Sequence, residues 1–132
     1  MKKLVSLIIL LIPVFLCGQQ RIYLSGIDHA SAVDWDFMIS GGANSGTWTT
    51  IPVPSNWEFF GFGNYTYGED FSKGRAGDET GFYKRTFTLQ RKAGRQYILT
   101  FQGVLTDAYV KINGQSAGPP HQGGFTRFRY NI

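Results

Sequence analysis

Short segments in which apolar and polar residues alternate make up most of this chain after its first eighteen residues. Alternation is typical of a strand with one buried face, whereas an amphipathic helix needs apolar residues spaced three and four apart. No stretch after residue 18 keeps the helical spacing over three turns. The sequence therefore predicts an all-β fold.

The alternating pattern predicts five strands and one hairpin. The strands are expected at 35–39, 48–53, 81–89, 96–102 and 108–112. Asn113-Gly114 follows the last of them directly, and an Asn-Gly pair supplies the positive φ angles of a tight hairpin turn. Phe128 and Tyr130 share one face of a further alternating segment, and the given sequence stops within it at Ile132. Because a sandwich needs closing strands to cover its edge, we expect the natural protein to be longer.

The N-terminus has the layout of a secretory signal peptide over residues 1–18. Lys2 and Lys3 precede the nearly uninterrupted apolar run 4–16. That run is shorter than the roughly 20 residues that cross a bilayer as a permanent helix. We therefore predict export to the periplasm, the cell envelope or the outside of the cell, with residues 19–132 as the mature domain.

Cys17 is the only cysteine, so no intrachain disulfide can form and the core alone must stabilise the domain. The segment around Cys17 is similar to a bacterial lipoprotein box, with Leu16 where a small residue is usual. Ordinary cleavage is the favoured interpretation, and lipidation of Cys17 is the alternative that would bring the protein to a membrane. Two of the 13 basic residues lie in the signal, so the formal charge falls from +4 to +2 and nucleic-acid binding is not expected.

Four segments carry a resemblance to a known family. They read WTTIPVPSNWE at 48–58, GFYKRTF at 81–87, FQGV with VKING at 101–104 and 110–114, and HQGGFTRF at 121–128. In this order they resemble the N-terminal sugar-binding domain of glycoside hydrolase family 2, the group of β-galactosidases, β-glucuronidases and β-mannosidases. The resemblance covers about residues 35–132.

The resemblance implies a galactose-binding-like jelly-roll β-sandwich, truncated at its C-terminus in this chain. Its partners would be a β-glycoside and two further domains of the same protein, one immunoglobulin-like and one a TIM barrel. Family members hydrolyse the glycosidic bond with retention, using two glutamates of the barrel. All nine carboxylates of this chain lie in the jelly-roll region. No catalytic residue and no cofactor is therefore expected here.

One residue of the chain is a candidate for substrate binding. In the β-galactosidase branch, an asparagine in a loop reading Asn-x-Thr-Tyr reaches into the sugar pocket of the barrel. Residues 64–67 read Asn-Tyr-Thr-Tyr and resemble that loop, although Gly68 replaces the proline that follows it. Asn64 is therefore a candidate for contact with substrate. The alternative is that its amide fixes the loop backbone, as asparagine side chains commonly do.

Acidic and histidine side chains do not form a recognisable metal motif. The acidic pairs at 69–70 and 78–79 lie in a glycine-rich loop, where they could gather around calcium or remain solvated. Their spacing fits no calcium loop, so solvated acids are favoured. His29 and His121 are far apart and lack cysteine partners in the mature chain, so no zinc site is expected. His121, beside Gln-Gly-Gly, is expected to form hydrogen bonds in a turn or between domains.

The aromatic residues of the long loop 57–80 suit sugar stacking, but Trp48 and Trp57 flank a Pro-x-Pro corner. We expect both indoles to pack into the core or onto a neighbouring domain. Three functional hypotheses follow. The first is the front domain of an exported glycosidase, and the second is a free-standing carbohydrate-binding or envelope interaction module without hydrolase activity. The third is an inactive structural fragment.

Overall fold

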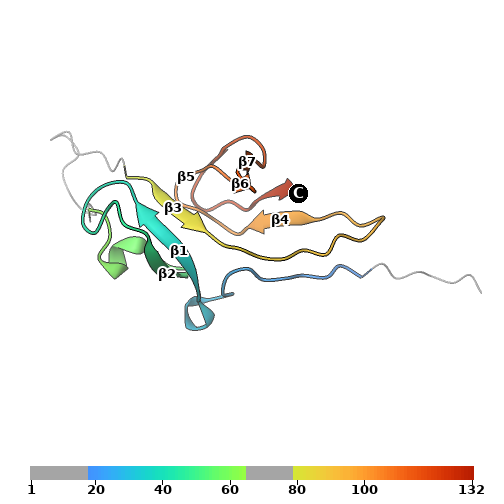
Figure 1. The fold of residues 1–132 in the computed structure, drawn as a ribbon, viewed down its shortest axis with the longest axis horizontal. Coiled ribbons are helices and arrows are strands. Elements are labelled where there is room, and N and C mark those ends of the chain that lie inside the picture. Colours follow the sequence, from blue (N-terminus) through green and yellow to red (C-terminus); the bar gives the residue numbers. More distant parts are fainter. Residues whose placement is uncertain (1–17, 65–78) are drawn as a thin grey trace, which may run out of the picture. The chain divides into compact units, whose positions relative to one another are not determined.

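The computed structural model describes residues 18–64 and 79–132. Residues 1–17 of the predicted signal peptide, with Cys17, and the acidic residues 69, 70 and 78 lie outside the described residues. The described part forms nine strands and two short 3₁₀ helices, with no α-helix, which confirms the all-β prediction. The chain divides into two compact units, Met1–Phe87 and Thr88–Ile132, and each is considered by itself (Figure 1).

The first unit contains an antiparallel sheet of three strands in the order β2-β1-β3 (Figure 1). Their bounds are β1 Val33–Ile39, β2 Thr49–Val53 and β3 Gly81–Lys84. The first two confirm the predicted strands, but the third is shorter than the predicted 81–89. Its pairing with β1 stops where Lys84 faces Asp36. There the Arg85 guanidinium donates to the carbonyl oxygen of Asp34 at 2.9 Å and takes the place of further strand pairing.

The core of this unit lies on one face of the sheet. Phe37, Ile39 and Ile51 are fully buried, because alternation along β1 and β2 directs them to the same side. The ring of Phe37 lies 5.1 Å from that of Phe62, edge to face, and 4.8 Å from that of Tyr83. Packed aromatic rings remove large apolar areas from water, so this cluster stabilises the sheet.

A short 3₁₀ helix, η2 (Trp57–Phe60), covers this core. The Asn56 side chain begins it by accepting a hydrogen bond from the Glu58 amide at 3.2 Å. The helix ends at Gly61, where a φ of 80° lets the amide donate back to the Glu58 carbonyl at 3.1 Å. Trp57 thereby lies against Gly81: a Cβ atom on that glycine would be 2.5 Å from the indole.

The N-terminal part of the same unit carries the other 3₁₀ helix, η1 (His29–Ser31). Asp28 caps it by accepting a hydrogen bond from the Ser31 amide at 2.8 Å, and the Ser31 hydroxyl donates to the same carboxylate at 2.7 Å. These hydrogen bonds hold the pKa of Asp28 below its usual value. The segment joins the sheet through the Trp35 indole, which donates to the Leu24 carbonyl at 3.0 Å.

The second unit consists of three antiparallel strand pairs, β4 with β9, β5 with β8 and β6 with β7. The bounds are β4 Ile98–Phe101, β5 Asp107–Ala108, β6 Lys111–Ile112, β7 Gln115–Ser116, β8 His121–Gln122 and β9 Phe128–Asn131. The strand predicted at 96–102 is confirmed in shorter form. The one predicted at 108–112 is two strands, because its two ends pair with different partners. The hairpin at 113–114 is confirmed, with φ angles of 51° and 81°.

Stacked rings form the core of the second unit. Phe128 lies between Phe101, at 4.8 Å between centroids, and His121, at 4.0 Å, with both pairs nearly parallel. Tyr130 packs edge to face on Phe128, and its hydroxyl donates to the Pro119 carbonyl at 2.8 Å. The predicted shared face of Phe128 and Tyr130 is therefore confirmed.

His121 also makes the turn contacts that the sequence indicates. Its Nε2 lies 3.0 Å from both the Gly123 carbonyl oxygen and the Thr126 hydroxyl. These two contacts tie the ring to the turn that follows β8, while the ring face remains stacked on Phe128. The expectation of a role in a turn is therefore confirmed, and a contact with another domain stays a prediction.

Replacing Gly81 with alanine tests the contact with Trp57. The added methyl would overlap the indole, and overpacking of this kind typically costs about 1–3 kcal/mol. Urea unfolding of Gly81→Ala should give a correspondingly lower free energy of unfolding. Gly41→Ala is the matched control, because a Cβ atom there meets only the Glu79 side chain at 3.4 Å. Equal stability of the two variants would contradict this packing.

Tyr83 makes stability depend on pH in the alkaline range. Burial raises the pKa of Tyr83 to about 12, from a usual value of 10.0. The folded chain then keeps the phenol proton at pH values where the unfolded chain has lost it. The contribution of Tyr83 to the free energy of unfolding is therefore complete below about pH 10 and is lost as the pH rises to about 12. The free energy of unfolding of Tyr83→Phe should depend less on pH in this window than that of the wild type. Tyr109→Phe changes a ring that is 77% exposed, so its free energy of unfolding should follow that of the wild type.

Candidate functional site

Three segments that are distant in sequence meet at the end of β1 in the first unit. Ala43 and Gly63 exchange two backbone hydrogen bonds of 3.0 Å each. The Ser40 amide donates to the Thr80 carbonyl at 3.0 Å, and the Ser40 hydroxyl accepts from the Thr80 amide at 2.8 Å. The turn after β1 therefore joins the segment 61–64 to the residues that precede β3.

Close backbone approach at this junction depends on Gly42. Its φ of 74° lies in the left-handed region, and a Cβ atom at this position would overlap the backbone of Gly63. Asn44, with a φ of 55°, adds a hydrogen bond of 2.9 Å from its side-chain amide to the Gly61 carbonyl. These contacts fix the backbone on which Asn64 stands.

Asn64 and Glu79 form a hydrogen-bonded pair at this junction. The Asn64 Nδ2 donates to the Glu79 Oε1 at 2.7 Å. The Glu79 side chain lies against Gly41, and it is half-buried, whereas Asn64 is exposed. Because the acceptor is a carboxylate, this is a charge-assisted hydrogen bond, which is shorter and stronger than one between neutral groups. The amide of Asn64 is therefore held in one orientation.

Counting only the described residues, the pair has both donors and acceptors left for a ligand. A carboxylate has two oxygens and an amide has one carbonyl oxygen and two N–H groups, so one mutual hydrogen bond leaves capacity on both side chains. Neighbouring hydroxyl groups of a sugar both donate and accept, and they match this combination. Hydrolysis of a glycosidic bond needs two carboxyl groups, one on each side of the bond. The pair contains only the carboxyl group of Glu79, so it is suited to binding a sugar and not to cleaving one.

The two tryptophans of the Pro-x-Pro corner have different environments. Trp57 packs against the buried core, which confirms the predicted core position, and it lies beside Gly63, next to Asn64 in sequence. Trp48 is 42% exposed, so a core position is wrong for this residue. Alternation along β2 places it on the face opposite Ile51, where the Lys84 ammonium lies 3.5 Å from its ring centroid. Contact of Trp48 with another domain stays a prediction.

Glu79 is the residue of the site that sequence reasoning missed. The acidic pair 78–79 was expected to be solvated, whereas Glu79 is the partner of Asn64. The signal lies in the strand register: Ile39 pairs with Gly81, so the residues after β1 must meet those before β3. Within residues 18–64 and 79–132, no three His, Cys, Asp or Glu side chains are grouped to hold a metal ion. In the same residues no helix has the length and apolarity to cross a membrane.

Comparison with known proteins adds no relative to this description. No family model, curated protein or solved structure matches the chain. A functional assignment therefore depends on the sequence motifs and on the geometry around Asn64.

Asn64→Asp tests whether the two side chains are in contact. Two carboxylates at hydrogen-bond distance cannot both ionise freely, so the pKa of one of them should rise relative to the wild type. A pH titration of the Glu79 carboxyl carbon by NMR would measure the change. Asn64→Ser removes the amide without adding a charge and is the control. The same Glu79 titration in both variants would contradict the observed pairing.

Proposed function

We propose that this chain is the N-terminal sugar-binding and support domain of an exported family 2 glycoside hydrolase. Asn64 and Glu79 together carry the proposal. Asn64 is the position to which the family resemblance points, and its amide is oriented by the Glu79 carboxylate at 2.7 Å. An exposed and oriented amide beside a carboxylate suits a sugar hydroxyl pair better than a freely rotating side chain does, because less conformational entropy is lost on binding.

In the proposed protein, this chain adopts a galactose-binding-like jelly roll and forms one wall of the active site. Both units contain antiparallel strands with one buried face, as the sheets of such a sandwich require. The two catalytic glutamates belong to a TIM barrel elsewhere in the same protein, and an immunoglobulin-like domain lies between. The chain alone binds a β-glycoside weakly and does not hydrolyse it.

Large exposed apolar side chains support the role as a packing partner. Phe59 in the first unit is 79% exposed, and Tyr109 and Phe125 in the second are 77% and 93% exposed. Aromatic residues are enriched at protein interfaces, where they supply large contact areas. In the proposed assembly these rings contact the further domains.

The coding sequence after Ile132 is the first test. The proposal expects several hundred further codons with an alternating β/α pattern and two barrel glutamates. The whole gene product should then hydrolyse a nitrophenyl β-galactoside, β-glucuronide or β-mannoside. A stop codon within about 30 residues would reject the proposal in favour of a free-standing binding module, whose binding of glycans would be measured on this chain.

Asn64→Ala in the whole gene product tests the substrate role. Removing one hydrogen bond to a sugar hydroxyl should lower kcat/KM by about tenfold. Gln122→Ala, at an exposed amide on β8, is the matched control and should leave kcat/KM unchanged. Wild-type kinetics of Asn64→Ala would contradict a contact between this residue and the substrate.

A further inference from the structure

Two loops of the second unit lie together and present apolar side chains to solvent. One loop follows β4 and the other follows β8. Leu105 in the first loop is 61% exposed, and Phe125 in the second is 93% exposed. We name residues 103–106 and 123–126 together the apolar tip.

Close backbone contact holds the two loops of the apolar tip together. The Gly123 amide donates to the Thr106 carbonyl oxygen at 3.1 Å. A Cβ atom at Gly124 would overlap the Leu105 side chain, and a Cβ atom at Gly103 would lie 3.0 Å from the Gly124 carbonyl oxygen. Because these positions are glycines, the Leu105 side chain packs directly on the second loop.

The turn that carries Phe125 is fixed from inside the second unit. The Thr126 hydroxyl donates to the Gly123 carbonyl oxygen at 3.3 Å, and both oxygens lie 3.0 Å from His121 Nε2. The His121 ring in turn stacks on Phe128 in the core. A side chain that a fixed turn presents loses little conformational entropy when a partner binds it. Phe125 is therefore preorganised for contact with a partner.

The apolar tip lies beside the end of the β4–β9 pair at which β9 begins. In this pair, Phe101 faces Phe128 next to the tip, and Ile98 faces Asn131 at the other end. Because a strand rises about 3.4 Å per residue, the two ends of the pair lie about 10 Å apart. The contacts that hold the tip come from residues 103–128. Its geometry is therefore set within the second unit, away from the last residues of the sequence.

The second unit carries an excess of positive charge. Residues 88–129 contain one acidic side chain and six basic ones. The basic residues are Arg91, Lys92, Arg95, Lys111, Arg127 and Arg129. Arg127 stands beside the apolar tip, because its Nε donates at 2.8 Å to the side-chain oxygen of Gln102, the residue before the first loop. A fixed guanidinium next to apolar side chains is complementary to a surface that is apolar and negatively charged.

We propose that the apolar tip docks on an acidic surface of a further domain of the same protein. Phe125 fills an apolar pocket of that surface, and Arg127 pairs with a carboxylate at its edge. Protein interfaces typically depend on a few aromatic and arginine side chains of this kind, surrounded by weaker contacts. A guanidinium also matches a carboxylate in bidentate geometry. This inference rests on the proposed function, which supplies the further domain.

The acidic residue of the second unit favours a protein partner over a lipid surface. Asp107 directly follows the first loop of the apolar tip, and it is exposed. Anionic lipid headgroups that attract Arg127 would repel this carboxylate at the same time. A protein surface can place a donor opposite Asp107 and a carboxylate opposite Arg127. The mixed charge beside the tip therefore fits a partner with a specific pattern of charges.

Hydrogen exchange of the backbone amides at 103–106 and 123–126 tests the proposal. These amides should exchange about tenfold or more slowly in the whole gene product than in this chain, because docking removes the tip from water. Equal exchange in both proteins would overturn the proposal. Hydrolase activity of the same gene product reports on the proposed function separately. An active enzyme with an unprotected tip would reject the tip contact alone.

Variants of the whole gene product assign the protection to the apolar tip. Phe125→Ser should abolish the slow exchange, and the substitution is compatible with folding because the ring is 93% exposed. Ile22→Ser is the matched control, since Ile22 is 62% exposed in the first unit, and it should keep the protection. Loss of protection in Ile22→Ser, or its persistence in Phe125→Ser, would overturn the assignment.

A second pair of variants tests the charge beside the tip. Arg127→Gln should reduce the protection, whereas Arg91→Gln removes the same charge away from the tip and should not. Arg91 lies with Asn131 and Ile132 in the lining of a different surface region. An equal effect of both variants would show that only the total charge matters, and would overturn the pairing of Arg127.

Two other partners of the apolar tip are tested with this chain alone. One measurement is its binding to vesicles of phosphatidylglycerol and phosphatidylcholine, and the other is its self-association by sedimentation. The proposal expects neither to change in Phe125→Ser. Vesicle binding or dimer formation that Phe125→Ser abolishes would assign the tip to lipid or to a second copy, and would overturn the proposal.

Discussion

The contact between the Trp57 indole and Gly81 is the constraint on which the first unit depends. It fixes η2 against β3, and the same indole lies beside Gly63 in the loop that leads to Asn64. A side chain at Gly81 would push the indole away from both segments. The Asn64–Glu79 pair joins these same two segments, since one partner follows Gly63 and the other precedes β3. One aromatic ring therefore takes part both in the core packing and in the position of the candidate site.

The second unit uses an analogous arrangement with a different ring. Phe128 is stacked between Phe101 and His121, so it connects β4, β8 and β9 in one pile of rings. Tyr97, just before β4, uses its phenol and its carbonyl to hold the loop around Arg91 and the residue after β9. In both units, an aromatic ring from one short segment contacts and positions other segments that are distant in sequence. Short strands with few ladder hydrogen bonds need such support from side chains.

Local sequence patterns predicted the strands of this protein better than they predicted the contacts between distant residues. Alternation identified β1, β2 and β9, and the Asn113-Gly114 dipeptide identified the hairpin, because period and turn chemistry are local properties. The short length of β3 and the exposure of Trp48 depend on which strand pairs with which, and one sequence does not specify this. The partner of Asn64 was missed for the same reason, since 15 residues separate it from Glu79. The motif indicated Asn64, but only the register of β1 and β3 places a carboxylate beside it.

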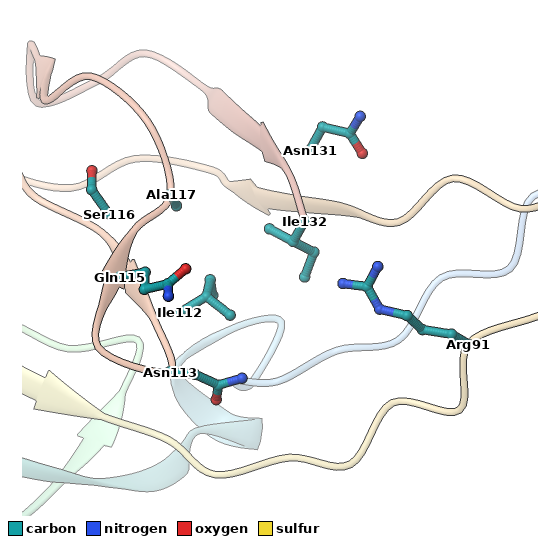
Figure 2. A pocket seen from close by; sticks show the side chains of 8 residues that line it. All are labelled: Arg91, Ile112, Asn113, Gln115, Ser116, Ala117, Asn131 and Ile132. Carbon is teal, nitrogen blue, oxygen red and sulfur yellow. The ribbon is translucent and has the colours of Figure 1, made fainter.

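The turn at 113–114 has a consequence for the chemical lifetime of the protein. Asparagine followed by glycine is the sequence most prone to deamidation, because a glycine amide can attack the side-chain carbonyl without steric hindrance. The dipeptide that closes the hairpin is thus also its least durable point. Loss of the amide would leave a carboxylate at position 113, in the lining of a surface hollow to which Arg91 also contributes (Figure 2). Aged molecules would therefore differ from new ones by one negative charge at this hairpin.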